Sequence, residues 1–213
     1  MQEGRNKRYR IGRRRLEQGL REGFEVTGAG TIKATEGEER HRIYLRHIDS
    51  GMRDCKWGRM KFEATLSEEM VLIVRVFASD EEEFVRGGKI QTFDSFFLDR
   101  KEPAIYKQKV YEAAKATKHI NSKDMLLYEQ RGRYLYIYLE VMGSGEAELG
   151  EIEIWTPGDN FYGTFPEIYR NEGETFFHRY LSIYSSLYGD LQEKIEHLYE
   201  YIDIDTAPAG ILP

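Results

Sequence analysis

Between residues 24 and 156 the sequence is divided into short runs whose apolar residues either alternate with polar ones or are nearly continuous. In 56–66 and 133–141 every second residue is apolar over most of the run, the pattern of a strand with one buried face. Residues 71–77 are apolar at every position except Arg75, as expected of a strand buried on both faces. Further short runs occupy 24–35, 42–46 and 151–155. Six or seven short strands with short connections predict a mainly antiparallel β-sandwich.

Two details of this region go beyond the strand count. Only Ser67 to Met70 separate the strands predicted at 56–66 and 71–77, so we expect these two strands to pair as a hairpin over 56–78. A helical insertion is predicted around 81–130, because Pro103–Thr117 has a helical composition and Pro103 suits the first turn of a helix. The fold class is therefore α+β, with a β-sandwich domain at 24–156 that contains a helical insertion.

A long amphipathic helix is predicted near the end of the chain. The apolar residues between 177 and 202 are spaced by three or four positions, which is the period of an α-helix with one buried face. A helix of about 30 residues is roughly 45 Å long, more than a small domain can cover. We therefore expect residues 157–213 to form a linker and a helical assembly segment that contacts other chains. The predicted protein-interface residues are Phe177, Tyr180, Tyr184, Leu187, Leu191, Ile195, Leu198 and Ile202.

A row of tyrosines marks one face of the strand predicted at 133–141. Tyr134, Tyr136 and Tyr138 alternate with aliphatic residues that would enter the core. Aromatic rings on a sandwich face can stack on sugars, which gives a glycan-binding module as one interpretation. The other interpretation is that the rings pack against the insertion or a neighbouring subunit, as aromatic side chains do at interfaces.

The first 23 residues form a predicted basic N-terminal arm. They contain eight Lys or Arg and three Glu, whereas the chain as a whole has a net charge of −6. Such an arm can bind nucleic acid, a membrane surface or an acidic protein. Tyr9 is its only aromatic residue, which argues against base stacking and leaves protein docking as the preferred interpretation.

The rest of the composition excludes several classes of protein. No apolar stretch approaches the 18 residues of a spanning helix, so no membrane span is expected. The first residues lack the apolar segment of a secretory signal, and the single cysteine, Cys55, allows no internal disulfide. These features predict a protein made in the cytoplasm.

The sequence contains no pattern that identifies a catalytic or metal site. The histidines have no ligand spacing, and Cys55 has no CxxC partner. The serine of Asp49-Ser50-Gly51 lies outside any nucleophile elbow, and Gly28-Ala29-Gly30 lacks the rest of a phosphate loop. We expect no enzyme, no catalytic residue, no metal, no cofactor and no small-molecule substrate.

Several segments resemble a phage tail protein family of contractile phage-like particles. The first lie between 49 and 80 and include Asp49-Ser50-Gly51, Cys55-Lys56-Trp57-Gly58-Arg59-Met60 and Val74-Arg75-Val76-Phe77-Ala78-Ser79-Asp80. The others lie between 131 and 213: Arg131-Gly132-Arg133-Tyr134-Leu135-Tyr136-Ile137, the turn at 143–145, Phe165-Pro166-Glu167-Ile168-Tyr169 and Asp203-Ile204-Asp205-Thr206-Ala207-Pro208-Ala209. The similarity covers roughly half of the chain and is carried by the order and spacing of these segments.

The resemblance implies a tail protein I-like subunit of the baseplate wedge in a contractile tail or contractile injection system. In such a wedge the helices bundle with baseplate J-like subunits around the central hub, within a particle that also contains the sheath. The implied function is that of a virion structural protein, assembled into a phage tail or phage-like particle. The alternative function is a glycan-binding β-sandwich module on a particle tip or cell surface.

Overall fold

The structure is a computed structural model that describes residues 7–156 together with Tyr188, Leu191 and Ile195. Residues 6–157 form one compact unit, which is described by itself. The three later residues are more than half exposed, and the positions 188, 191 and 195 are helical. The linker and the remaining positions of the predicted C-terminal helix lie outside the described residues.

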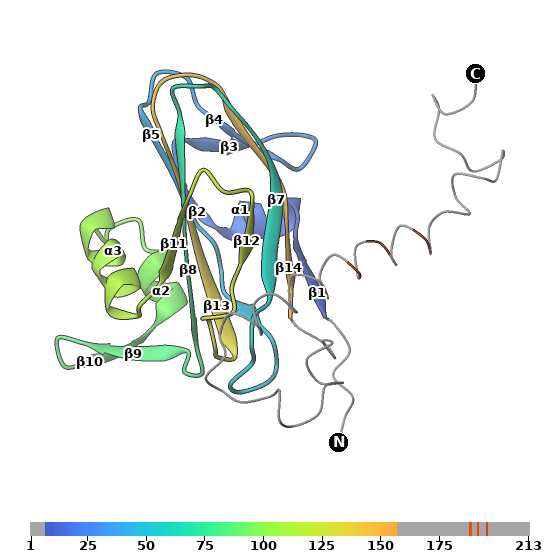
Figure 1. Cartoon of the computed structure of the whole chain (residues 1–213). Helices are drawn as coiled ribbons and strands as arrows, with labels where there is room; N and C mark the ends of the chain where they lie inside the picture. The colour runs from blue at the N-terminus through green and yellow to red at the C-terminus, as the bar shows by residue number, and fades with distance from the viewer. Residues whose placement is uncertain (1–6, 157–187, 189–190, 192–194, 196–213) are drawn as a thin grey trace. The chain divides into compact units, whose positions relative to one another are not determined.

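The compact unit is a sandwich of two antiparallel sheets, which confirms the predicted β-rich fold (Figure 1). Sheet A has the strand order β12-β7-β14-β4-β3, with β1 paired to the last part of β14. Its strands are β1 (Arg8–Ile11), β3 (Phe24–Val26), β4 (Ile32–Ala34), β7 (Arg59–Leu66), β12 (Asp124–Leu126) and β14 (Ala147–Trp155).

Sheet B has the order β11-β8-β13-β5-β2, with β6 also paired to β13. Its strands are β2 (Leu20–Glu22), β5 (Arg40–Tyr44), β6 (Ile48–Asp49), β8 (Val71–Ser79), β11 (Thr117–Ile120) and β13 (Tyr134–Met142). β8 and β13 pair along their whole length, from Val71 opposite Met142 to Ser79 opposite Tyr134.

The main core lies between the two sheets and follows from strand alternation. Ile152 and Ile154 of β14 and Leu139 and Val141 of β13 are buried, and all four belong to one apolar cluster. Trp57 is fully buried in the same cluster, and its indole Nε1 donates a hydrogen bond to the Gly132 carbonyl at 2.9 Å. The alternate residues of each strand face outward, so each sheet presents a second face whose chemistry is set by those residues.

The prediction of a hairpin over 56–78 is wrong. β7 pairs with β12 and β14 in sheet A, whereas β8 pairs with β11 and β13 in sheet B. The turn after Leu66 therefore carries the chain from one sheet to the other. Within the run 24–35, β3 and β4 pair with each other.

The prediction of a separate basic N-terminal arm is also wrong, because from residue 8 onward this region belongs to the sandwich. β1 pairs with β14 in sheet A, and β2 pairs with β5 in sheet B. Between them, the short helix α1 (Arg13–Gln18) inserts the fully buried Leu16 into the core. The arginines of this region lie on the outside, while Tyr9 and Ile11 pack inward.

The insertion is shorter than the predicted 81–130, because β11 and β12 pair into sheets B and A. The part before β11 forms a third layer on the outer face of sheet B (Figure 1). It begins with the hairpin of β9 (Glu83–Arg86) and β10 (Lys89–Thr92), followed by α2 (Phe93–Phe97) and α3 (Ala104–Ala113). Thr92 caps α2 by accepting a hydrogen bond from the Ser95 amide at 3.1 Å, and Pro103 precedes the first turn of α3. A second apolar cluster, mainly aromatic, joins these helices to sheet B.

Candidate functional site

Two of the predicted interface residues are among the described ones. Leu191 and Ile195 lie at helical positions and are 55% and 60% exposed, and Tyr188 beside them is 56% exposed. Spacings of three and four residues place these side chains on one side of an α-helix, which we call the C-terminal apolar face. Six other predicted interface residues lie outside the described part of the chain: Phe177, Tyr180, Tyr184, Leu187, Leu198 and Ile202.

Two of the three residues of the tyrosine row, Tyr136 and Tyr138, are not a free surface, so the glycan interpretation is wrong for them; Tyr134 is partly exposed. Tyr136 and Tyr138 are fully buried under the insertion. The Tyr136 ring centroid lies 4.7 Å from that of Phe77 and 4.9 Å from that of Phe93. Burial also raises the pKa of the Tyr136 phenol well above its ordinary value. The alternative interpretation, packing against the insertion, is confirmed for these two rings.

Charged groups within this layer have structural partners. Asp94 of α2 accepts hydrogen bonds from the His47 amide at 3.1 Å and from Arg46 Nε at 3.2 Å, and its Oδ2 lies 3.0 Å from His47 Nδ1. Burial alone would raise the pKa of Asp94, but the hydrogen bonds and charge of His47 and the hydrogen bond of Arg46 outweigh it, so the pKa is lowered. These contacts tie α2 to the loop after β5.

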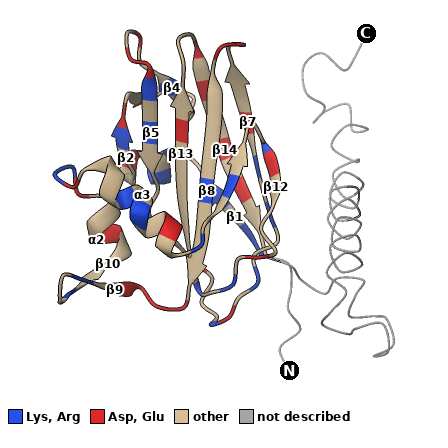
Figure 2. Cartoon of the chain, turned by 60° about the vertical axis from the view of Figure 1, so that its left-hand side comes forward, with Lys and Arg blue, Asp and Glu red and all other residues tan. Residues whose placement is uncertain are grey.

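The outer face of sheet A offers a different surface. Basic and acidic residues are interspersed along its strands, whereas α2 and α3 pack on the opposite side of the sandwich (Figure 2). The pairing of β1, β14, β7 and β12 places outward-facing residues in rows that cross four strands. One row runs Arg8, Trp155, Arg59, Leu126, and the next runs Arg10, Glu153, Lys61, Asp124.

The first of these, the tryptophan row, is built around an indole between two arginines. The Arg8 guanidinium carbon lies 5.4 Å from the Trp155 ring centroid, and that of Arg59 lies 5.8 Å away, within the range of cation–π contacts. Each arginine is held by a carboxylate, since Arg8 pairs with Glu153 and Arg59 Nε donates to Asp124 at 2.6 Å. The indole, which is partly exposed, is therefore fixed in place by its neighbours.

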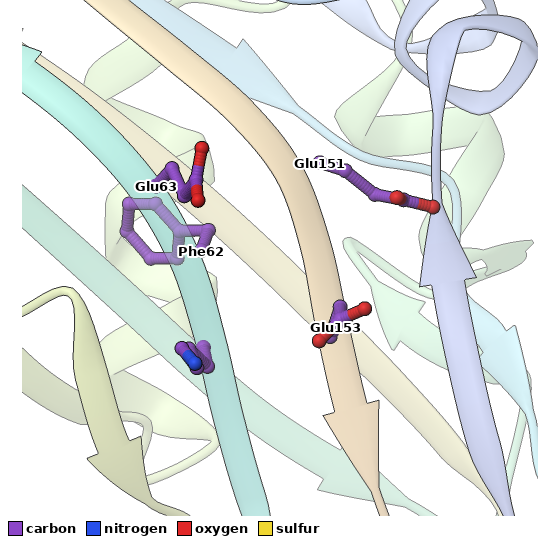
Figure 3. Close-up of a pocket in the computed structure, with 5 residues that line it drawn as sticks. Phe62, Glu63, Glu151 and Glu153 are labelled. Atoms are coloured by element: carbon purple, nitrogen blue, oxygen red, sulfur yellow. The ribbon is translucent and has the colours of Figure 1, made fainter. Parts of the chain in front are cut away.

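Beside these rows the sheet is hollowed by a β-bulge. The register of β14 against β7 shifts between Leu149 and Ile152, so that Gly150 and Glu151 together oppose Glu63. A depression lies there, which we call the carboxylate depression (Figure 3), lined by Lys61, Phe62, Glu63, Glu151 and Glu153. Gly150 matters for its shape, because a Cβ at this position would lie 3.3 Å from the Glu63 Cβ.

Sequence reasoning did not single out this face, although part of the signal was present. In 151–155 the buried isoleucines alternate with Glu151, Glu153 and Trp155, which places a tryptophan on an outward position. The two flanking arginines come from 8 and 59, and only the pairing of the strands brings them together.

Two kinds of feature are absent from the described residues. Within them, no three His, Cys, Asp or Glu side chains are grouped so as to hold a metal ion. No helix among them has the length and apolar character needed to cross a membrane.

The two facing antiparallel sheets define the chain as a β-sandwich protein with an added helical layer. No family model matches the sequence. No curated protein matches it either.

Among solved structures, weak likenesses are found at low identity. A glycosylation-associated protein complex from Streptococcus agalactiae gives a TM-score of 0.38 at 9% identity over 72% of this chain and 26% of that one. A low-affinity xylan-binding module from Roseburia intestinalis gives 0.33 at 8% identity over 72% and 97%. Infectious bursal disease virus, Gx strain, gives 0.30 at 10% identity over 76% and 33%. The chain thus spans about a quarter of the first of these and a third of the last, and at such TM-scores they carry no argument about function.

Proposed function

We propose that this protein is a structural assembly component, in particular a tail protein I-like baseplate wedge subunit of a contractile tail or contractile injection system. The C-terminal apolar face carries the proposal. Leu191 and Ile195 are helical and more than half exposed, so they are available to another chain. The resemblance of 49–80 and 131–213 to the tail protein family supports the same assignment and names baseplate J-like subunits as the partners.

The physical reason is the cost of leaving such a face in water. Complete burial of a side chain the size of leucine or isoleucine is worth about 1.5–3 kcal/mol. A helix that repeats such residues every three or four positions gains this free energy at each position once a partner helix covers it. The sandwich then acts as a rigid block that is held in register by the bundle.

The proposal is tested by expressing the chain together with the neighbouring baseplate proteins and isolating the complex. Leu191→Asp should abolish co-purification, because it places an unpaired charge in the bundle at a cost of several kcal/mol. Leu191→Met is the matched control, since it keeps an apolar side chain of similar volume and should assemble normally. If Leu191→Asp and Ile195→Asp both join the complex as the unchanged chain does, the proposed interface does not exist.

The folded state of each variant is checked separately. Circular dichroism and the melting temperature of the sandwich should be the same in Leu191→Asp and Leu191→Met, because residue 191 lies outside the unit formed by 6–157. A loss of assembly with an intact sandwich then reports on the interface alone.

A further inference from the structure

We propose that the outer face of sheet A binds a neutral glycan chain, which lies across the tryptophan row and places hydroxyl groups in the carboxylate depression. This site is independent of the C-terminal apolar face and goes beyond the assembly function. It lies on the side of the sandwich opposite to the buried Tyr136 and Tyr138.

The tryptophan row supplies an aromatic surface whose position is fixed. A sugar ring presents C–H groups on its flat faces, and these pack favourably on the exposed part of an indole. Arg8 and Arg59 flank Trp155 on neighbouring strands and hold its ring between them. Little ordering is then required when a ligand binds, which favours affinity.

The carboxylate depression supplies polar groups that are not already used. Lys61, Glu63 and Glu151 form no hydrogen bond or ion pair through their side chains with the other described residues. In contrast, Glu153 is engaged with Arg8 and lies 3.4 Å from Arg10 Nε. A lysine donor and two carboxylate acceptors around one hollow match the vicinal hydroxyls of a sugar, which both donate and accept hydrogen bonds.

The balance of charge selects a neutral ligand. The two rows and the depression together contain four basic and four acidic side chains: Arg8, Arg10, Arg59 and Lys61, against Glu63, Asp124, Glu151 and Glu153. Nucleic acid requires an excess of positive charge to neutralise its phosphates, and this face has none. The core of a protein–protein interface is depleted in charged residues, whereas here Trp155 and Leu126 are the only outward apolar residues of the two rows.

The test uses the two tryptophans of the chain as a built-in signal. Trp57 is fully buried, so a change in fluorescence on adding a ligand reports mainly on Trp155. Soluble xylan, mixed-linkage β-glucan, galactomannan and dextran serve as neutral probes, with alginate and heparin as acidic ones. Affinity electrophoresis in gels containing the same polymers gives a second readout that does not depend on fluorescence. We expect at least one neutral polymer to retard the full chain and change its emission.

The variants separate the site from the rest of the sheet. Trp155→Ala should weaken binding about tenfold, and Glu151→Ala about fivefold, the effect of one lost hydrogen bond. Glu25→Ala is the matched control, because Glu25 is an exposed glutamate on the other half of sheet A, and it should bind like the unchanged chain.

Four results would overturn the proposal: no neutral polymer binds, only the acidic polymers bind, Trp155→Ala and Glu151→Ala bind as tightly as Glu25→Ala, or Trp155→Ala loses a protein partner while no glycan binds. The last would make the face a protein-docking surface. None of these results depends on Leu191, so the glycan proposal and the assembly proposal fail separately.

Discussion

At the scale of single residues, Gly132 shows how a turn near the end of the sandwich depends on one missing side chain. Its φ is +148°, and a Cβ at this position would lie 2.5 Å from the carbonyl carbon of Ser79. Its own carbonyl accepts the hydrogen bond from the buried Trp57 indole at 2.9 Å. Any side chain here must therefore displace backbone and disturb a buried hydrogen bond.

We predict that Gly132→Ala destabilises the sandwich by more than the ~1–3 kcal/mol of backbone strain alone. Urea unfolding followed by circular dichroism measures the change. Gly37→Ala is the control, because Gly37 also has a positive φ, +86°, but a Cβ there meets no atom within 4 Å. Equal losses of stability in the two variants would show that the close approach of residue 132 to Ser79 costs nothing.

A second prediction at this scale concerns Lys107, a fully buried lysine of α3. Its Nζ donates to the Asp99 carbonyl at 2.8 Å and lies 4.6 Å from the Tyr44 ring centroid. Burial lowers the pKa of Lys107 below its ordinary 10.5, although the nearby acidic groups partly oppose the shift. The folded protein therefore holds this proton less tightly than the unfolded chain does, and Lys107 costs stability most at pH values below its folded pKa.

It follows that the stability of the unchanged chain should rise relative to that of Lys107→Met as the pH increases towards 10.5. Urea unfolding of both proteins at pH 7 and at pH 9.5 measures the difference, and titration of the tyrosines cancels because both chains contain them. Lys109→Met removes the same charge from an exposed position of the same helix and serves as the control. A difference between the unchanged chain and Lys107→Met that is independent of pH would contradict the prediction.

At the scale of elements, the helical layer on sheet B is held by the aromatic cluster that includes Tyr136. The hydroxyl of Tyr136 is buried and has no hydrogen-bond partner among the described residues. We predict that Tyr136→Phe leaves stability unchanged or raises it by about 1 kcal/mol, because an unsatisfied buried polar group is removed. Tyr136→Ala should lower stability by about 3–5 kcal/mol through the cavity it leaves.

Thermal unfolding of the two variants measures the difference in their stability. The glycan titrations then test whether a change at Tyr136 affects binding. The Tyr136→Phe chain should bind the neutral polymers as the unchanged chain does, because the ring lies on the outer face of sheet B and the proposed site lies on that of sheet A. A stabilising role for the hydroxyl, seen as a melting temperature well below normal in Tyr136→Phe, would show that it has a partner.

Elements were also the level at which sequence reasoning succeeded best. The alternation in β13 and the continuous apolar run of β8 are local patterns, and both strands were predicted. The pairing predicted between β7 and β8 is wrong, because residues distant in the sequence decide which sheet a strand joins. In β1 the apolar residues Tyr9 and Ile11 alternate as a strand requires. The arginines between and around them led to the interpretation of this segment as a basic arm.

The candidate site also combines a feature that follows from a local sequence pattern with features that depend on long-range strand pairing. The outward position of Trp155 follows from its alternation with Ile152 and Ile154, which are both buried. Its setting between Arg8 and Arg59 follows from two pairings that join residues about 95 to 150 positions apart, and the depression follows from a bulge in β14. No local pattern specifies these features, because they arise from long-range register.

At the scale of the whole molecule, the proposed assembly interface and the proposed glycan site belong to different compact units. Both apolar clusters lie within residues 11–154, and 6–157 form a unit of their own. We predict that a fragment ending at Pro157 folds cooperatively and melts within about 4 °C of the full chain, the shift that corresponds to roughly 1 kcal/mol for a domain of this size. Circular dichroism and calorimetry measure this.

The same fragment should separate the two functions, because it keeps Trp155 and lacks Leu191. It should bind the neutral polymers with unchanged affinity and fail to co-purify with the baseplate proteins, whereas full-length Leu191→Met should do both. Light scattering should show the fragment as a monomer, since the C-terminal apolar face is gone. A fragment that joined the baseplate complex would locate the interface on the sandwich, and one that folded but no longer bound glycan would show that residues beyond 157 complete the site.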